Sequence, residues 1–327
     1  MDISYDFFRL IRKPIRALYK NKAEDTYKSQ LYEKYVNLFD QDANDYIREQ
    51  LMTDKPLMVS KFGGFELTEL CTWQSLHIKR PNIHDVWRFL KGERETLWWD
   101  FGIDGLCSNA GFFPNDDSLR PRYYHINVQA MKNIDVLGSY LAEEYQFKEE
   151  LKDAVKVNLN GYYAPFLYKN PWTSALKGKK VLVVHPFDKE IQMQYSKRKL
   201  LWKDENVLPE FDELITYKSI QSMLGADVKY KNWFDALEKM EDDISKIDFD
   251  VAIVGCGAYG MPLSSYIKTL KKQVIHLAGW TQVLFGIKGG RWENLDFVSS
   301  FFNDSWIRPY KNSTPLNAEQ IEKGCYW

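Results

Sequence analysis

The chain has 327 residues, a hydrophobic fraction of 45% and a formal net charge of −1. These values describe an ordinary soluble globular protein of one large α/β domain or two modest ones, and they exclude a disordered or fibrous chain. The near-zero net charge argues against nucleic acid as a partner, and no apolar run reaches the ~18 residues of a transmembrane helix.

The four cysteines and five histidines form no pattern typical of a metal or disulfide site. No two cysteines are spaced as C-x-x-C and no two histidines as H-x-x-x-H. Neither a zinc enzyme nor a secreted disulfide framework is therefore expected. Because we also recognise no signal peptide, we predict a cytoplasmic protein with reduced thiols.

The first 22 residues carry a basic amphipathic pattern, interrupted at Pro14. Its apolar side chains recur at helical spacing: Phe7, Leu10, Ile11, Ile15 and Leu18. In residues 1–22, six basic residues stand against two acidic ones. Such a segment could lie peripherally on the anionic inner face of a membrane. Alternatively, it packs on its own domain and presents a solvated basic face.

Residues 28–51 also follow a helical period, so residues 1–52 are expected to form an N-terminal helical segment. Strands are then predicted at residues 57–62, 134–138, 181–186, 248–254 and 274–279, with a weaker one at 214–217, and residues 155–171 are predicted to be strand and loop. Helices are predicted at residues 65–76, 139–154, 189–202, 233–246 and 261–270. This alternation indicates an α/β, Rossmann-like fold with a mainly parallel sheet and helices on both faces. Residues 53–327 would form this domain, whose two halves could face one cleft.

A G-x-G-x-x-G turn, formed by Gly255, Gly257 and Gly260, links two of the predicted strands through a helix. This order is required of a βαβ nucleotide-binding unit, in which backbone amides approach a pyrophosphate. A dinucleotide site usually has an acid at the end of the next strand, but that strand ends His276-Leu277-Ala278-Gly279-Trp280. NAD is therefore disfavoured. The alternative is that the glycines only permit close helix packing.

A second strand–glycine–helix junction lies at Gly63 and Gly64, between Lys61 and Glu66. Ligands of open α/β sheets bind beyond the carboxyl ends of the strands, where these residues are expected. Glu66 could hold a metal ion or act as a general base, or it could be a first-turn acid favoured by the helix dipole. His185 and Asp188, after another strand, are alternative bases, although a lone histidine at a strand end is often structural.

A basic glycine-rich loop, residues 286–292, follows the last predicted strand and Gln282. Its flexible backbone with Lys288 and Arg291 suits a diphosphate leaving group, and Trp292 could stack on a base or sugar. The alternative is an ordinary solvent-exposed loop.

Five motifs together resemble the bacterial GT-D-type glycosyltransferases, over roughly residues 56–295. They are Lys61–Leu67, Asn109–Pro114, Val183–Tyr195, Gly255–Gly260 and Gln282–Trp292. The last two are the most specific. The resemblance implies a Rossmann-like enzyme of surface-polysaccharide or glycoprotein glycan assembly.

The family's best-known members carry an Asp-x-Glu pair in an Arg-Phe-Gly-Asp-Gly-Glu run, which serves the metal ion and the nucleotide sugar. Here Lys61 stands at the Arg place and Glu66 at the Glu place, but Gly64 stands at the Asp place. The resemblance thus implies Mn²⁺ or Mg²⁺ at Glu66, whereas the lost carboxylate removes one of the ligands such an ion usually has.

The sequence therefore predicts a nucleotide-sugar-dependent glycosyltransferase acting on a glycan or lipid-linked acceptor. The glycine turns, Lys288 and Arg291 would stabilise the leaving diphosphate, and Glu66, or else His185 or Asp188, would assist the acceptor hydroxyl. Two alternatives stay open: an NAD(P)-dependent oxidoreductase and a non-catalytic nucleotide-binding protein.

Overall fold

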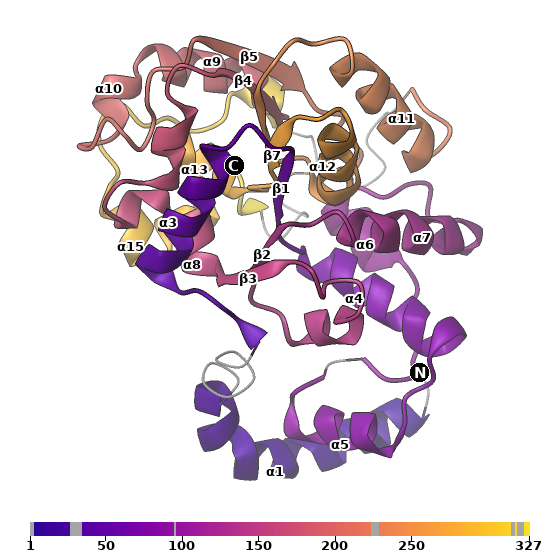
Figure 1. Cartoon of the computed structure of the whole chain (residues 1–327). Helices are drawn as coiled ribbons and strands as arrows, with labels where there is room; N and C mark the ends of the chain where they lie inside the picture. Colours follow the sequence, from indigo (N-terminus) through magenta and orange to yellow (C-terminus); the bar gives the residue numbers. More distant parts are fainter. Residues whose placement is uncertain (1–2, 27–34, 95, 224–228, 315–317, 319–323) are drawn as a thin grey trace.

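A parallel sheet lies at the centre of the computed structural model, which describes residues 3–26, 35–94, 96–223, 229–314, 318 and 324–327 (Figure 1). Within these residues the sheet has seven strands in the order β3-β2-β1-β7-β6-β4-β5, and every neighbouring pair is parallel. The strands are β1 Leu57–Ser60, β2 Val136–Ser139, β3 Val155–Asn158, β4 Lys180–His185, β5 Glu213–Lys218, β6 Val251–Val254 and β7 Gln273–Ile275. The predicted α/β, Rossmann-like fold is confirmed.

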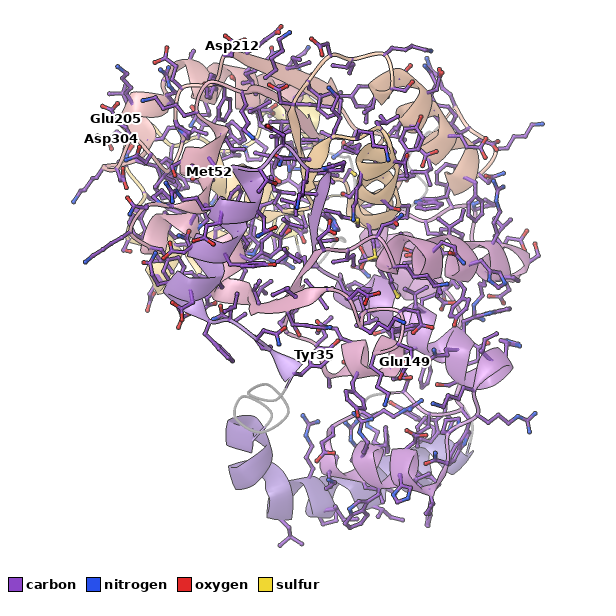
Figure 2. All side chains as sticks on the ribbon, viewed as in Figure 1. Tyr35, Met52, Glu149, Glu205, Asp212 and Asp304 are labelled. Carbon is purple, nitrogen blue, oxygen red and sulfur yellow. The ribbon has the colours of Figure 1, made fainter. Side chains whose placement is uncertain are left out.

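Helices cover both faces of the sheet. One face packs against α4 (Gly64–Trp73), α6 (Asp104–Ala110), α7 (Arg120–Met131), α11 (Trp233–Ile244) and α12 (Gly260–Thr269). The other packs against α3 (Asp40–Leu51), α8 (Leu159–Tyr163), α9 (Asp188–Ser196), α10 (Arg198–Leu201), α13 (Trp280–Leu284), α14 (Gly290–Glu293) and α15 (Asp296–Ser299). Figure 2 shows the side chains that fill the space between the layers.

The strands read as apolar runs because both of their faces are buried. Successive side chains of a strand point to opposite faces, so Met58 and Val59 of β1 belong to different core clusters. The same alternation divides Leu182 from Val183 in β4. Each residue of the central strands β1, β2, β6 and β7 is thereby removed from water by one of the two helix layers, whereas the edge strand β5 is only partly covered; this burial is the main stabilisation of the fold.

The direction of each crossover decides which face its helices cover. Connections that step from β1 to β2, β5 to β6 and β6 to β7 run over the first face, whereas those from β3 to β4 and β4 to β5 run over the second. Right-handed crossovers require this separation. Neighbouring strands β1, β7, β6 and β4 consequently send their chains to alternate faces, which opens a crevice at their carboxyl ends.

Several predicted boundaries are wrong. Residues 28–34 of the predicted helix 28–51 lie outside the described residues; Tyr35 is helical, residues 36–39 are not, and α3 begins at Asp40. Leu38 instead bridges Val157, because the outer edge of β3 offers unpaired backbone groups: Asn37 N donates to Lys156 O at 2.7 Å. The predicted helix at 139–154 is reduced to a short 3-10 helix, Ala142–Phe147, and that at 189–202 is divided into α9 and α10.

The N-terminal helix α1 (Ile3–Thr26) runs through Pro14 without interruption. It lies away from the sheet and packs against α5 (Ile83–Lys91), as Figure 1 shows at the bottom of the view. A third, small apolar cluster joins them, built on Phe89, Leu97 and Trp99. The predicted helical segment 1–52 thus divides: α1 joins α5, whereas α3 belongs to the core of the sheet.

Candidate functional site

A cavity of about 250 Å³ opens at the carboxyl edge of the sheet. Its walls come from the segments that follow six strands, among them Gly63 after β1, Tyr140 after β2, His185 at the end of β4, Ser219 after β5 and Gly255 after β6. The segment after β7, residues 276–282, closes another side. The volume lies just below the usual ~300–1,000 Å³ of small-molecule sites. The site lies where the crevice between diverging crossovers predicts it.

The two predicted glycine turns meet in this cavity. Gly63 and Gly64 line it from the start of α4, and Gly255 and Gly257 from the turn before α12. The backbone N–H groups of Cys256, Gly257 and Ala258 donate to no acceptor within the described residues. Amides at the start of a helix carry partial positive charge, so this wall can receive an anionic ligand.

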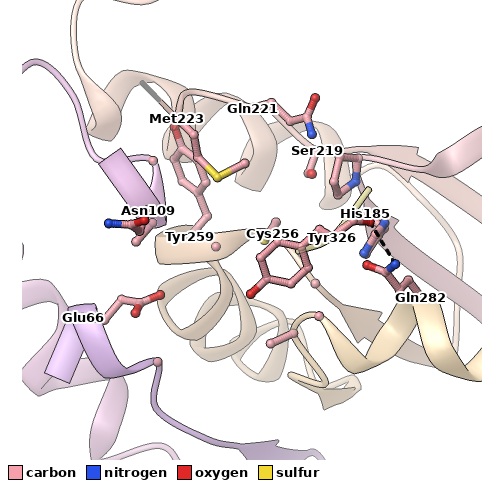
Figure 3. A pocket seen from close by; sticks show the side chains of 18 of the residues that line it. Glu66, Asn109, His185, Ser219, Gln221, Met223, Cys256, Tyr259, Gln282 and Tyr326 are labelled. Atoms are coloured by element: carbon pink, nitrogen blue, oxygen red, sulfur yellow. Dashed lines mark hydrogen bonds between the residues drawn. The ribbon is translucent and has the colours of Figure 1, made fainter. Parts of the chain in front are cut away.

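Glu66 contributes the only carboxylate among the lining residues that the structure describes. Its side chain curls back over the helix start, since a Cβ added at Gly63 would lie 2.0 Å from Glu66 Oε2. Lys61 also lines the cavity, with Nζ 5.5 Å from the Tyr140 ring centroid. In Figure 3, Glu66 and Asn109 lie on one side of the cavity, and His185, Ser219 and Gln282 on the opposite side.

His185 faces the cavity as a hydrogen-bond donor. Its Nδ1 accepts from Phe187 N at 3.1 Å, so in the neutral ring Nε2 carries the proton. Burial lowers the pKa of His185 to about 3, because the charged ring would be desolvated. A neutral ring whose acceptor nitrogen is already occupied cannot take a proton from a substrate readily. The geometry therefore favours a donor role over the base role predicted for His185.

Two polar side chains after β5 add to this wall. Ser219 is 3% exposed, and its Oγ has no partner in the described residues; the same holds for Gln221 Nε2. Both residues line the cavity. A buried polar atom without a partner costs free energy, so these groups are suited to bind a polar ligand. Together with His185 and the amides after β6, they form a wall rich in hydrogen-bond donors.

The upper wall is tied together by Ser222. Its Oγ donates to Gly111 O at 2.5 Å and lies 2.8 Å from Tyr259 Oη. Tyr259 in turn stacks on the buried ring of Trp233, with centroids 5.0 Å apart. These contacts hold the segments after β5 and β6 and the end of α6 in one arrangement, which pre-forms the cavity.

Tyr326 and Trp327 form the remaining side. Arg291 Nη1 donates to Tyr326 Oη at 2.8 Å, and Arg291 N donates to Cys325 O at 2.8 Å. The backbone of Tyr326 comes so close to residue 289 that glycine is required there, since a Cβ would lie 2.9 Å from Tyr326 O. The glycines of the predicted phosphate loop therefore serve packing as well, and Arg291 is the cation that this loop contributes to the cavity.

The structure brings most, though not all, of the predicted residues together. Lys61, Gly63, Gly64, Glu66, His185, Gly255, Gly257, Gln282 and Arg291 line the cavity. Gln282 is 1% exposed and its Nε2 donates to Lys288 O and Tyr326 O, both at 3.1 Å, so it acts chiefly as an internal tie. Gly260, Asp188, Lys288 and Trp292 do not line it.

Each of these four has another place. Gly260 packs against His276, whose Nε2 would lie 2.0 Å from an added Cβ, so close helix packing explains this glycine. Lys288 Nζ lies 5.4 Å from the Phe302 ring centroid, and the Trp292 ring is 1% exposed in the core. Asp188 is the first residue of α9 rather than its N-cap, which is Phe187.

Sequence reasoning missed Tyr140, Ser219, Gln221, Tyr326 and Trp327. The strand-end rule could have found Ser219 and Gln221, because they follow β5 directly, but the weak apolar pattern of residues 214–217 drew no attention to that end. Tyr326 and Trp327 reach the cavity through a return of the chain over the Gly286–Trp292 loop. No local pattern in the sequence predicts such a contact.

The described side chains that line the cavity do not by themselves form a metal site. No group of three or more His, Cys, Asp or Glu side chains within the described residues could hold a metal ion. Glu66 alone would have to be joined by oxygen atoms of a bound ligand, because Gly64 stands where the family that the sequence resembles has its second carboxylate. No described helix has the length and apolarity needed to cross a membrane.

Comparison of this chain with protein-family models, with curated proteins and with solved structures finds no match.

Proposed function

We propose that the chain is a glycosyltransferase that uses a nucleoside-diphosphate sugar. The observation that carries this proposal is the opposition of one carboxylate, Glu66, to a wall of hydrogen-bond donors across one cavity. A diphosphate needs donors without nearby acids, and an acceptor hydroxyl needs a base. The resemblance in sequence points to the same chemistry.

In this proposal the donor's diphosphate lies against the amides of residues 256–258 and the Nε2–H of His185. Arg291 adds positive charge. The acceptor oxygen forms a bond to the anomeric carbon while the bond from that carbon to the phosphate oxygen breaks. The hydroxyl proton passes to Glu66, and the nucleoside diphosphate leaves with the electron pair. Hydrogen-bond donors directed at the charge that develops on the leaving group are the main source of rate enhancement.

Turnover across a panel of nucleotide sugars, with and without EDTA, tests the proposal directly. The readout is nucleoside diphosphate released with a glycan or lipid-linked acceptor present. We expect Glu66→Gln to lower turnover by about 10²- to 10⁴-fold while nucleotide binding persists. The matched control is Asp188→Asn, which alters the other predicted carboxylate outside the cavity and is expected to retain turnover. No turnover together with no nucleoside-diphosphate binding would refute the proposal.

A comparison of thermal shifts separates the alternatives. UDP or GDP is expected to raise the Tm, whereas NAD(H) is not, because no acid follows β7 to hold a ribose: that strand leads into His276 and Leu277. Stabilisation by NAD(H) alone would favour the oxidoreductase. Stabilisation by a nucleoside diphosphate without turnover on any donor would favour a non-catalytic nucleotide-binding protein.

A further inference from the structure

Helix α1 contacts the rest of the protein through one face. Tyr5 meets the rings of Trp99 and Phe101 edge-on, with centroids 5.1 and 4.9 Å apart. Phe8 packs on Trp98 at 5.4 Å, and the guanidinium of Arg12 lies 4.3 Å from the ring centroid of Phe89. These contacts account for the side of the helix that faces α5.

A second face of α1 is apolar and open to solvent. Phe7, Leu10 and Leu18 are 58%, 67% and 81% exposed, and Pro14 and Ala17 are exposed between them. These five residues, at positions i, i+3, i+7, i+10 and i+11, form one stripe along the helix. We name this stripe the outer face. A contiguous apolar stripe of this kind marks an interaction site.

The charges beside the outer face have one sign. Between Tyr5 and Leu18, Arg9, Arg12, Lys13 and Arg16 stand against the single acid Asp6, although the whole chain has a net charge of −1. Arg9, Lys13 and Arg16 are exposed and border the stripe on one side. An apolar stripe bordered by Arg and Lys fits the boundary between acyl chains and anionic headgroups.

We propose that the outer face of α1 docks the protein on an anionic lipid surface. The helix would lie in the plane of the interface, with Phe7, Leu10 and Leu18 among the acyl chains and its basic side chains among the headgroups. Attachment to the body through α5 leaves this face clear of the sheet (Figure 1).

The position of α1 relative to the cavity gives this contact a role. Tyr5 touches Phe101, which is 60% exposed and lies three residues before the start of α6. The far end of α6, Asn109 and Ala110, lines the cavity, and its start touches Phe65 on the rim. A helix of this length spans about 10 Å, so α1 contacts the protein about one such helix length from the lining of the cavity. That an acceptor reaches the cavity from this surface rests on the proposed glycosyl transfer, whereas the docking itself does not.

Vesicle co-sedimentation of the full chain tests the docking without any donor. We expect the protein to bind vesicles with about 30% phosphatidylglycerol at least about tenfold more tightly than pure phosphatidylcholine vesicles, with weakening as salt rises from about 0.1 to 0.5 M. The double variant Leu10→Ser/Leu18→Ser should reduce binding at least about tenfold. Arg9→Glu/Lys13→Glu should abolish the preference for anionic vesicles.

Leu200→Ser is the matched control, since Leu200 is 62% exposed on α10, which packs on the sheet core. It should bind vesicles as the unaltered chain does. Unaltered binding by Leu10→Ser/Leu18→Ser, or equal binding to both vesicle types, would overturn the proposal. So would a dimer, seen by analytical ultracentrifugation, that the same double variant dissociates, because a second copy would then cover the outer face. Circular dichroism confirms that each variant keeps its helices.

Discussion

At the scale of single residues, Gly64 is the most informative position. It stands where the resembling family has an Asp, and a Cβ added there meets no atom within 4 Å. The space for a side chain is therefore present, and only the side chain is missing. Glu66, two positions on, has kept its place at the cavity. In the proposed glycosyl transfer, the amides of residues 256–258 and Arg291 would neutralise the charge of the leaving group in place of a second carboxylate.

The open space beside Gly64 predicts that an added carboxylate would give the protein a metal site. Gly64→Asp should create a two-carboxylate site with Glu66 and confer Mn²⁺ binding. At a Mn²⁺ concentration ten times its Kd, the variant should gain about 1.4 kcal/mol of stability, measured as a rise in Tm. The control Gly64→Asn has nearly the same shape without the charge, and it should show no rise. Equal Tm values with and without Mn²⁺ in the Asp variant would contradict this.

His185 makes a prediction about pH. Its pKa is lowered from 6.5 to about 3 in the folded state, so below pH 6.5 the unfolded chain binds a proton that the folded chain does not. Its contribution to stability is present above pH 6.5 and is lost as the pH falls. Between pH 7 and pH 5 this loss is about 2 kcal/mol.

The comparison that isolates this effect is His185→Gln, measured by urea denaturation at both pH values. Because Gln has no titrating group, the free energy of unfolding of the variant should fall by about 2 kcal/mol less than that of the unaltered chain. Buried His276, whose pKa burial and the charge of Lys61 lower to about 3, titrates in both proteins and cancels. If the free energy of unfolding changed equally in both proteins between pH 7 and pH 5, the pKa of His185 would not be lowered in the folded state.

At the scale of elements, the two glycine turns differ in what their glycines do. Gly257 has a φ of +60°, and a Cβ there would lie 2.7 Å from Ala110 O, at the end of α6. Gly64 begins α4 without either constraint. The Gly257 position is thus locked against a neighbouring backbone, whereas the Gly64 position is open.

Alanine substitution should separate the two turns. Gly257→Ala is expected to lower the free energy of unfolding by about 1–3 kcal/mol, because the left-handed backbone is strained with a Cβ and the Ala110 carbonyl must move. Gly64→Ala should be neutral or stabilising by up to about 1 kcal/mol, because alanine favours the helix. Urea denaturation measures both. A stability loss for Gly64→Ala as large as that for Gly257→Ala would contradict the assigned difference.

At the scale of the whole molecule, Arg120 holds one wall of the cavity to the body. It is 3% exposed and donates from Nε to Glu69 Oε1 at 2.7 Å, and from Nη1 to Asp100 Oδ2 at 2.8 Å. These bonds link α7, α4 and the segment before α6. Burial raises the pKa of Glu69 while the Arg120 hydrogen bonds lower it, so the carboxylate depends on its partner.

Removing this partner should be costly. Arg120→Ala is expected to destabilise the fold by about 3–5 kcal/mol, since it leaves the buried Glu69 carboxylate unpaired. Lys246→Ala breaks the exposed pair with Asp242, whose side chains are 65% and 58% exposed, and should change stability by about 1 kcal/mol or less. Guanidinium denaturation compares the two. Equal losses of unfolding free energy in the two variants would mean that the Arg120 hydrogen bonds stabilise the fold no more than the exposed pair does.

The sequence by itself determined the α/β class, the segments that hold the seven strands that the structure describes, and the two glycine turns. Their signals are local: an apolar run of four to six residues followed by glycine and a helical period identifies a strand–turn–helix unit without reference to the rest of the chain. Lys61, Glu66, Gly255 and Gly257 were found in this way, because the strand-end rule translates position along the chain into position at the sheet edge.

Only the tertiary structure decided which of those residues share the cavity. Tyr326 reaches it through contacts with Gln282 and Arg291, and Ser219 through the pairing of β5 with β4. Packing and burial likewise place Lys288 and Trp292 outside the cavity. They also favour His185 as a hydrogen-bond donor rather than as a base. These outcomes depend on contacts between residues far apart in the chain. Such contacts are set by how the layers pack as a whole, and a local pattern carries no information about them.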